Sequence, residues 1–299
     1  MATPGREITP DPAAEPAPGG MTPLRVETAP TPAACDTCPA NTRGSFTRLG
    51  ANVPGGDFVV ALAGNPNTGK STVFNALTGL RQHTGNWPGK TVTRAEGGFA
   101  YNGKKFRIVD LPGTYSLLST STDEEVARDF ILFGRPDVTV IVADATRLER
   151  NLNLVLQVLE ITDRAVVCLN LIDETARHGI TVDERSLARD LGVPVVPTAA
   201  REGKGIDSLL ATMHEVATGT LVCRPHRISN TSRTMQRAVA HLTEQVATEF
   251  PGLPNARWVA LRLLEGDQRI IDAVRSGELA SIARNAAASG VANEAGRGG

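Results

Sequence analysis

The chain carries the stretch Gly64-Asn65-Pro66-Asn67-Thr68-Gly69-Lys70-Ser71, which matches the phosphate-loop pattern G-x-x-x-x-G-K-[ST]. An apolar run at 58–63 precedes it and is typical of a buried strand. A helical spacing follows over 71–80, with Gly79 as a stop signal. Glycines between a strand and a helix start let backbone N–H groups converge on phosphate oxygens, and the positive helix end adds a favourable field. We therefore predict a strand, a phosphate-binding loop and a helix in this order.

The side chains of this loop have distinct expected roles. Lys70 is expected to reach the terminal phosphates of a nucleotide and to act in catalysis, and the Ser71 hydroxyl is expected to ligate Mg²⁺. The expected nucleotide contacts in this stretch are Gly64, Asn65, Asn67, Thr68, Gly69, Lys70, Ser71 and Thr72. The alternative is a glycine-rich turn without a ligand, against which the flanking strand and helix signals argue.

Length and composition are typical of a globular protein, except that the N-terminal residues have a different composition. The 299 residues suffice for one or two domains, and 41% apolar with 21% charged residues is typical of soluble proteins. A net charge of −1 gives no general attraction to nucleic acid or anionic lipid. No apolar run approaches the roughly 20 residues that cross a bilayer. Residues 1–56, rich in proline and alanine, are predicted to be a disordered arm.

Four cysteines do not make a disulfide framework and fit a reducing compartment. Cys35 and Cys38 form a lone C-x-x-C, and Cys223 and His226 lie far downstream. Together these four residues would supply a Cys₃His zinc site. The alternative is that the thiols are exposed to solvent and that Cys223 and His226 belong to a linker.

A second motif, Asp110-Leu111-Pro112-Gly113, has the form D-x-x-G. It follows the second of two strand-like runs joined by Asn102-Gly103, a strong hairpin signal. Asp110 is expected to hold Mg²⁺ through its water shell. The Gly113 N–H is expected to bond the γ-phosphate, which exists only in the triphosphate state, so this loop is predicted to switch with the nucleotide.

A glycine-rich stretch between these motifs, Gly85–Thr93, has neither a helical nor a strand period and is predicted to be a first switch loop. Thr91 is our choice for the second protein ligand of Mg²⁺, with Thr93 as the alternative. Trp87 is expected either to anchor the loop by packing or to contact the nucleotide.

A motif for base selection, Asn170-Leu171-Ile172-Asp173, follows two further apolar strands at 138–143 and 165–169. The Asp173 carboxylate can accept from N1–H and the 2-amino group of guanine, whereas adenine offers neither donor. Asn170 is expected to brace the loops around the base. After a last strand at 193–196, Thr198, Ala199 and Ala200 are expected to line the base, with the Ala200 N–H approaching guanine O6.

The strands alternate with helices at about 151–162 and 205–216, and one hairpin interrupts the alternation. We therefore predict an α/β fold with a mixed, mostly parallel six-stranded sheet and helices on both faces. All proposed ligand loops leave carboxyl ends of strands, where such sheets bind ligands. The domain prediction is a GTPase domain at 57–222, a linker at 223–231, a small all-α domain at 232–288 and a flexible tail at 289–299.

The motifs together resemble the cytoplasmic GTPase domain of FeoB-type bacterial ferrous iron transporters. Asn86-Trp87-Pro88-Gly89 followed by Thr91, and the string Asp110–Leu117, are more specific than general GTPase motifs. The resemblance covers about residues 57–285, and the stretch 257–267 is similar to the family's helical domain, which is thought to slow GDP release. It implies a GTP- and GDP-binding switch that regulates ferrous iron uptake.

The resemblance also implies a place and a partner. The family's iron pathway is a membrane domain that follows this region, and the sequence shows none, so we expect a fragment, a split gene or an independent GTPase. We expect a cytoplasmic position at the inner face of the bacterial inner membrane, with a membrane iron-permease domain or subunit as partner. No nucleic-acid partner is expected.

Hydrolysis is expected to be slow, because Thr114 stands where Ras-like enzymes carry a water-orienting glutamine. The resemblance implies K⁺ in place of an arginine finger, with Asn67 as its ligand; alternatively, Asn67 only stabilises the loop turn. Two other functions stay open. One is a soluble ribosome-assembly or tRNA-modification GTPase, and the other is a nucleotide-dependent binding module with negligible turnover.

Overall fold

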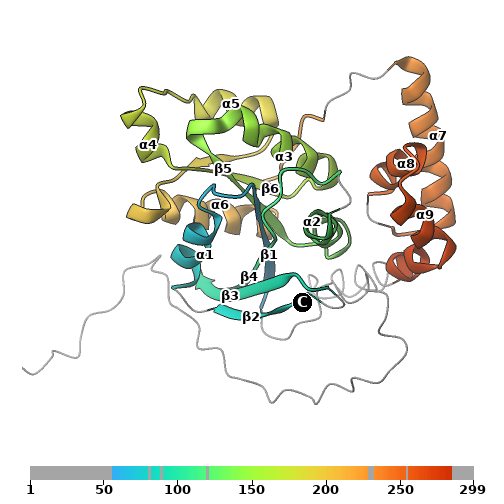
Figure 1. Ribbon diagram of the computed structural model, residues 1–299, viewed down its shortest axis with the longest axis horizontal. Helices are drawn as coiled ribbons and strands as arrows, with labels where there is room; N and C mark the ends of the chain where they lie inside the picture. Colours follow the sequence, from blue (N-terminus) through green and yellow to red (C-terminus); the bar gives the residue numbers. More distant parts are fainter. Residues whose placement is uncertain are drawn as a thin grey trace, which may run out of the picture.

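The strand before the phosphate loop, β1 (Phe58–Gly64), lies inside a seven-stranded sheet of order β2-β3-β4-β1-β5-β6-β7 (Figure 1). The computed structural model describes residues 56–79, 82–87, 90–118, 121–227, 232–253 and 255–284, and all statements below concern these residues. The strands parallel to β1 or to one another are β4 (Lys104–Asp110), β5 (Val138–Asp144), β6 (Ala165–Asn170) and β7 (Val195–Pro197). This confirms the mixed, mostly parallel sheet.

The seventh strand corrects the prediction of six. Strand β2 (Gln82–Asn86) pairs antiparallel with β3 (Thr93–Tyr101), with Asn86 opposite Thr93. Part of the stretch predicted as irregular is therefore strand. Residues 83–86 are exposed, so this part of the edge strand has no buried face and no apolar alternation to reveal it. Strand β3 continues into β4 through the predicted hairpin at Asn102-Gly103.

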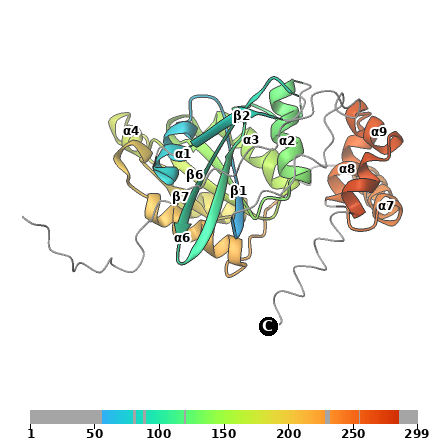
Figure 2. The same cartoon turned by 90° about the horizontal axis from the view of Figure 1, so that it is seen from below.

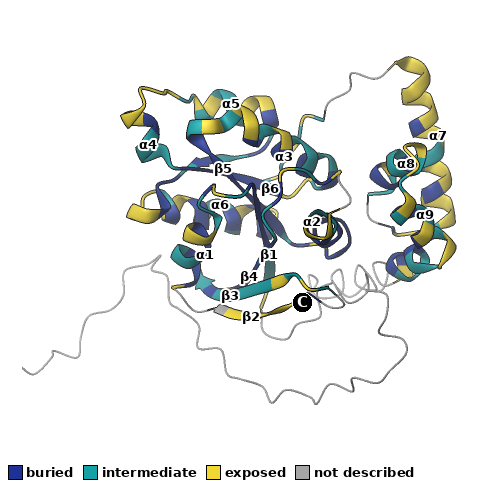
Figure 3. Ribbon diagram, viewed as in Figure 1, coloured by how far each residue is buried: buried dark blue, intermediate teal, exposed yellow. Residues whose placement is uncertain are grey.

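Two helical layers cover the sheet because β1 and its neighbours are apolar on both faces. Ala61 and Ala63 face a core shared with α2 (Thr122–Phe133), α3 (Leu148–Ile161) and the end of α5 (Glu184–Leu191). Val60 and Leu62 face the opposite core with α1 (Lys70–Thr78) and α6 (Ile206–Thr218). Figure 3 shows the buried strands between these layers.

Helices α2 and α5 are elements that the sequence analysis did not predict. The Ser121 side chain caps α2 by accepting from the Glu124 N–H at 3.3 Å. The Asp183 carboxylate caps α5 by accepting from the Ser186 N–H at 3.0 Å. The spacing Ser121-x-x-Glu124 has the form of a capping box, so the sequence did contain a start signal for α2. A short helix, α4 (Ile172–Arg177), follows β6.

The C-terminal helical unit contains α7 (Arg233–Glu249), α8 (Ala256–Leu264) and α9 (Gln268–Arg275) and lies beside α2 in both views (Figures 1 and 2). The Arg128 guanidinium of α2 lies 3.5 Å from Asp267 and 5.9 Å from the centre of the Trp258 ring. Buried side chains of both units form one continuous apolar cluster. None of the described helices has the length and apolar character that spanning a bilayer requires.

Candidate nucleotide-binding site

The four predicted ligand loops lie at one edge of the sheet. They follow β1, β4, β6 and β7, which run in the same direction, so their carboxyl ends meet. In doubly wound sheets this edge is where ligands bind. The structure thus brings together loops that are more than a hundred residues apart in the sequence.

Two glycines make the phosphate loop possible. Gly69, which caps the start of α1, has φ of +80°, and a Cβ there would lie 2.4 Å from Asn170 Nδ2. A Cβ on Gly64 would lie 2.7 Å from the Val142 carbonyl oxygen. Any larger residue at either position would strain the backbone or push the loop off its neighbours. The loop therefore keeps its backbone amides close to the start of α1, as a phosphate cradle requires.

Lys70 and Asp110 are paired with each other in this structure. Lys70 Nζ lies 2.5 Å from Asp110 Oδ1, and both side chains are largely buried. Burial raises the pKa of Asp110, and the Lys70 charge opposes this rise. We predicted phosphate and magnesium partners for these two residues, so binding of a nucleotide at the predicted position would require the pair to separate.

The oxygen donors expected for Mg²⁺ are only partly assembled. Ser71 is exposed at the start of α1, next in the chain to Lys70, and Mg²⁺ prefers oxygen ligands such as its hydroxyl. Thr72, a predicted nucleotide contact, is also exposed. Thr91 is exposed in the first switch loop, and Thr93 is exposed at the start of β3. Among the described residues, neither threonine is hydrogen-bonded to Ser71 or Asp110, so the choice between Thr91 and Thr93 stays a prediction.

The D-x-x-G loop lies against the phosphate loop. A Cβ on Gly113 would lie 3.5 Å from Pro66 Cα, and the Thr114 N–H donates to the Gly64 carbonyl at 3.3 Å. The Thr114 side chain is buried, so it offers no group to orient a water at the open side of the site. This placement agrees with the expected role of the Gly113 N–H, which remains a prediction.

Asn170 is the central polar residue of the site and is 1% exposed. Its Nδ2 donates to the Thr68 carbonyl at 3.0 Å, which ties β6 to the phosphate loop. Its Oδ1 accepts from the Ala200 N–H at 3.1 Å and from the Thr198 hydroxyl at 3.2 Å. One amide thus holds three loops together, and its expected role of bracing them around a base stays a prediction.

Asp173 lies at the start of α4 and is half-buried. The turn before it contains Leu171 with φ of +63°, an uncommon value for a bulky residue and one that is found at ligand loops. The carboxylates of Glu202 and, to a smaller degree, Asp173 raise the pKa of Lys204. Lys204 is therefore a cation near the expected base site that the sequence analysis did not single out.

The loop after β7 differs from its expected role in one respect. Thr198 is fully buried under the loop, and the Ala200 N–H donates to Asn170 instead of pointing to open space. The Ala199 N–H is also engaged, with the Lys204 carbonyl at 3.0 Å. A bond from Ala200 to guanine O6 would therefore require this donor to be shared or exchanged.

Two asparagines of the phosphate loop differ in environment. Asn67 is exposed and has φ of +66°, a conformation that asparagine tolerates and that shapes the loop turn. Asn65 is 3% exposed, and within the described residues its amide has no hydrogen-bond partner. Asn67, the predicted K⁺ ligand, is thus the exposed one of the two, and its role stays a prediction.

Trp87 packs as an anchor. It is 1% exposed, its ring centre lies 5.4 Å from that of Phe130 on α2, and the Arg94 guanidinium lies 4.7 Å from the ring centre. Of the two roles predicted for this side chain, packing describes its position in the structure.

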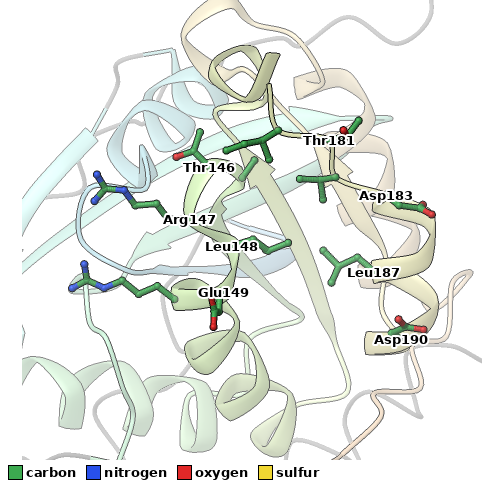
Figure 4. Close-up of a pocket in the computed structure, with 12 residues that line it drawn as sticks. Thr146, Arg147, Leu148, Glu149, Thr181, Asp183, Leu187 and Asp190 are labelled. Carbon is green, nitrogen blue, oxygen red and sulfur yellow. The ribbon is translucent and has the colours of Figure 1, made fainter. Parts of the chain in front are cut away.

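An open cavity of about 670 Å³ lies elsewhere, between the start of α3 and the segment 180–190 (Figure 4). Thr146 and Leu148 line one side, and Thr181, Asp183 and Leu187 line the other. None of the residues predicted to bind nucleotide lines it. We therefore place the site by the converging loops and not by this cavity.

The proposed zinc residues are only half within the described chain, because Cys35 and Cys38 lie outside it. The half-buried Cys223 has Sγ 3.5 Å from the Ala165 carbonyl oxygen, and His226 Nδ1 lies 3.1 Å from the Asp190 carbonyl oxygen. No group of three or more potential metal ligands occurs among the residues that the structure describes. The backbone at 223–227, predicted as linker, bonds to the end of α5.

The fold and the four loops define a P-loop nucleotide-binding domain of the GTPase class. Comparison with known proteins identifies the family within this class. Residues 58–213 match the family model for ferrous iron transport protein B, and residues 232–296 match the FeoB cytosolic helical domain. The chain belongs to the FeoB family, as the resemblance of its motifs indicated.

Relatives and solved structures agree with this assignment. The Fe(2+) transporter FeoB of Salmonella choleraesuis is 42% identical over 212 residues, which cover 70% of this chain. The cytosolic domain of L. pneumophila FeoB is 34% identical with a TM-score of 0.66, and the match covers 76% of this chain and 88% of that one. The T. maritima FeoB cytosolic domain in a GDP form is 33% identical with a TM-score of 0.66, and the match covers 78% of this chain and 98% of that one. The chain spans 27% of the length of the Salmonella relative.

Proposed function

We propose that this chain binds GTP and GDP at the carboxyl edge of its sheet and hydrolyses GTP as a switch that regulates ferrous iron uptake. The observation that carries the proposal is the Asn170 amide, which joins the phosphate loop to the loop after β7. This arrangement supports a site in which the Gly69 cradle and the Asp173 carboxylate act on the same nucleotide. The T. maritima structure in a GDP form supports the choice of nucleotide.

The residues have separate parts in the proposed reaction. A water attacks the γ-phosphorus, the bond to the bridging oxygen breaks, and GDP and phosphate leave. Lys70 and the N–H groups at the start of α1 neutralise phosphate charge, and Gly113 N–H contacts the γ-phosphate. Mg²⁺ supplies further charge neutralisation when bound, with Ser71, Asp110 and Thr91 as its proposed holders.

Binding is tested by calorimetry with Mg²⁺ and GDP, GTP or ATP. We expect heat for GDP and GTP and much weaker binding of ATP, because Asp173 has no donor to accept from on adenine. No heat for GDP, or equal affinity for ATP and GTP, would refute the assignment.

The potassium requirement is a separate part of the proposal. Asn67 is exposed at the open side of the loop, where its amide oxygen can face a monovalent cation. We expect faster phosphate release in K⁺ than in Na⁺ buffer, and Asn67→Ala should abolish the difference while GDP affinity is retained. Equal rates in the two buffers would end this part alone and leave a slower, K⁺-independent GTPase.

The role in iron uptake comes from the family and applies to the longer proteins that its relatives are named for. We propose that the chain acts at the inner face of the bacterial inner membrane with an iron-permease domain or subunit. Lys70→Ala in the cell's own gene should reduce Fe²⁺ uptake, measured with radioactive iron at a matched protein level. Unchanged uptake would refute the regulatory role. It would also revive a GTPase unrelated to transport, which the family match does not favour.

A further inference from the structure

One face of α3 contacts the loop that follows the D-x-x-G motif. Arg150, Asn153 and Gln157 are spaced by three and four residues, so their side chains project from the same side of the helix. Two of them contact Tyr115, Ser116 and Leu117. None of these three α3 residues belongs to a nucleotide motif.

Gln157 makes the closest of these contacts. Its Oε1 accepts from the Leu117 N–H at 2.6 Å and from the Ser116 hydroxyl at 3.1 Å. Its Nε2 donates to Asn153 Oδ1 at 3.2 Å, one helical turn earlier. The bond from Leu117 fixes the orientation of the Gln157 amide, because a flipped amide would direct an N–H group at the Leu117 N–H.

The two ends of the contacted segment are held in other ways. Before it, the Thr114 N–H donates to the phosphate loop at Gly64. At its end, the Leu117 side chain is buried in the core shared with α2 and α3. Between them, the Arg150 guanidinium lies 4.5 Å from the ring centre of Tyr115, which is 44% exposed. The Tyr115 ring is therefore partly exposed and is contacted by a charged side chain of α3.

We propose that Gln157 is a positioning residue for GTP hydrolysis, supported by Arg150, and that it holds the Tyr115–Leu117 backbone so that Gly113 stays beside the phosphate loop. The inference rests on the proposed GTPase function. Thr114 is buried and offers no side chain to orient water, so this loop is expected to act through its main chain, at the Gly113 N–H. The position of that main chain depends on the residues that contact it. Gln157 bonds to this main chain directly.

The effect is expected on hydrolysis and not on GDP binding. The loop contacts the γ-phosphate, which GDP lacks, so loosening it should leave GDP affinity unchanged. Loss of two hydrogen bonds that act only on the placement of the loop should lower the single-turnover rate at saturating GTP by about tenfold. Arg150→Met should have a smaller effect, because the Tyr115 ring is partly exposed.

The test compares three variants of the full chain. Gln157→Leu removes the one oxygen that accepts both bonds, at similar volume, whereas Gln157→Glu keeps oxygen acceptors for the Leu117 N–H and the Ser116 hydroxyl. Glu160→Gln, on the next turn of α3, is the matched control. The measurements are single-turnover GTP hydrolysis in K⁺ and Mg²⁺, GDP affinity by calorimetry, thermal unfolding, and amide hydrogen exchange of the segment 114–118.

The proposal expects slow hydrolysis and faster exchange in Gln157→Leu, with GDP affinity unchanged and only a small fall in melting temperature, and near-normal rates in Gln157→Glu and Glu160→Gln. Normal hydrolysis in Gln157→Leu, or equal loss in Gln157→Glu, overturns it. If Gln157→Leu does not fold, Ser116→Ala and the Glu variant still test the contact. A wild-type chain without any turnover refutes the GTPase function, and hydrogen exchange then decides whether Gln157 holds the loop.

Discussion

The hydrogen bonds of Asn170 allow a quantitative prediction for Asn170→Ala. The side chain is 1% exposed, and its three hydrogen bonds join the phosphate loop at Thr68 to Thr198 and Ala200. Truncation leaves the Ala200 N–H and the Thr68 carbonyl without this partner in a buried place. At roughly 1 kcal/mol or more for each lost bond, the free energy of unfolding should fall by about 2–4 kcal/mol.

A matched control is available in Asn151→Ala. Asn151 is 4% exposed and undergoes the same truncation, but its Nδ2 donates only to the Arg147 carbonyl within the same helix region, at 2.8 Å. Its Oδ1 has no partner among the described residues. The loss there should be about 1 kcal/mol or less.

The assay is urea denaturation of nucleotide-free protein, followed by GDP calorimetry on the folded variants. Asn170→Ala should also weaken GDP binding, because two loops of the site lose their common support. If Asn170→Ala and Asn151→Ala lose the same free energy of unfolding within experimental error, the Asn170 amide does not hold the loops together and the reasoning fails.

Two further predictions concern single carboxylates. Asp173→Asn should weaken GDP binding by about a hundredfold or more, since two charge-assisted bonds are lost. It should leave the melting temperature unchanged, because Asp173 is half-buried and outside the Asn170 bonds. Calorimetry with GDP and xanthosine diphosphate, whose 2-carbonyl can accept from asparagine, checks this, and unchanged GDP affinity contradicts it. Burial of Asp129 in α2 raises its pKa to about 6, opposed by Arg128 and Arg269. The folded chain therefore binds this proton more readily than the unfolded chain. The free energy of unfolding of the wild-type chain, measured relative to that of Asp129→Asn, should therefore rise by on the order of 2 kcal/mol as the pH falls from 7 to 4. If the stability of the two proteins changes with pH in the same way, Asp129 is not the source of the predicted rise.

Local sequence patterns predicted the elements that position the site. The apolar runs of β1, β5 and β6 are buried on both faces, and such runs are visible without knowledge of their neighbours. Gly79 ends α1 in the left-handed conformation, as a glycine stop signal predicts. The phosphate loop and the N-x-x-D motif were likewise located by patterns that lie within a few residues.

The features that the sequence did not reveal depend on partners far along the chain. Strand β2 exists through backbone pairing with β3, and its exposed side chains carry no period. The contact between Gln157 and Leu117 joins residues forty positions apart, and glutamine on a helix is usually a solvated residue. The Lys70–Asp110 pair likewise joins two motifs whose expected partners were ligands.

The packing around α2 places both tryptophans of the chain at useful positions. Trp87 meets Phe130 on the side of the first switch, and Trp258 meets Arg128 on the side of the helical unit. The molecule therefore carries one natural fluorophore at each boundary of this helix. Replacing either indole with phenylalanine would leave a single emitter, so the timing of motion at the two boundaries after nucleotide addition can be recorded separately without an attached dye.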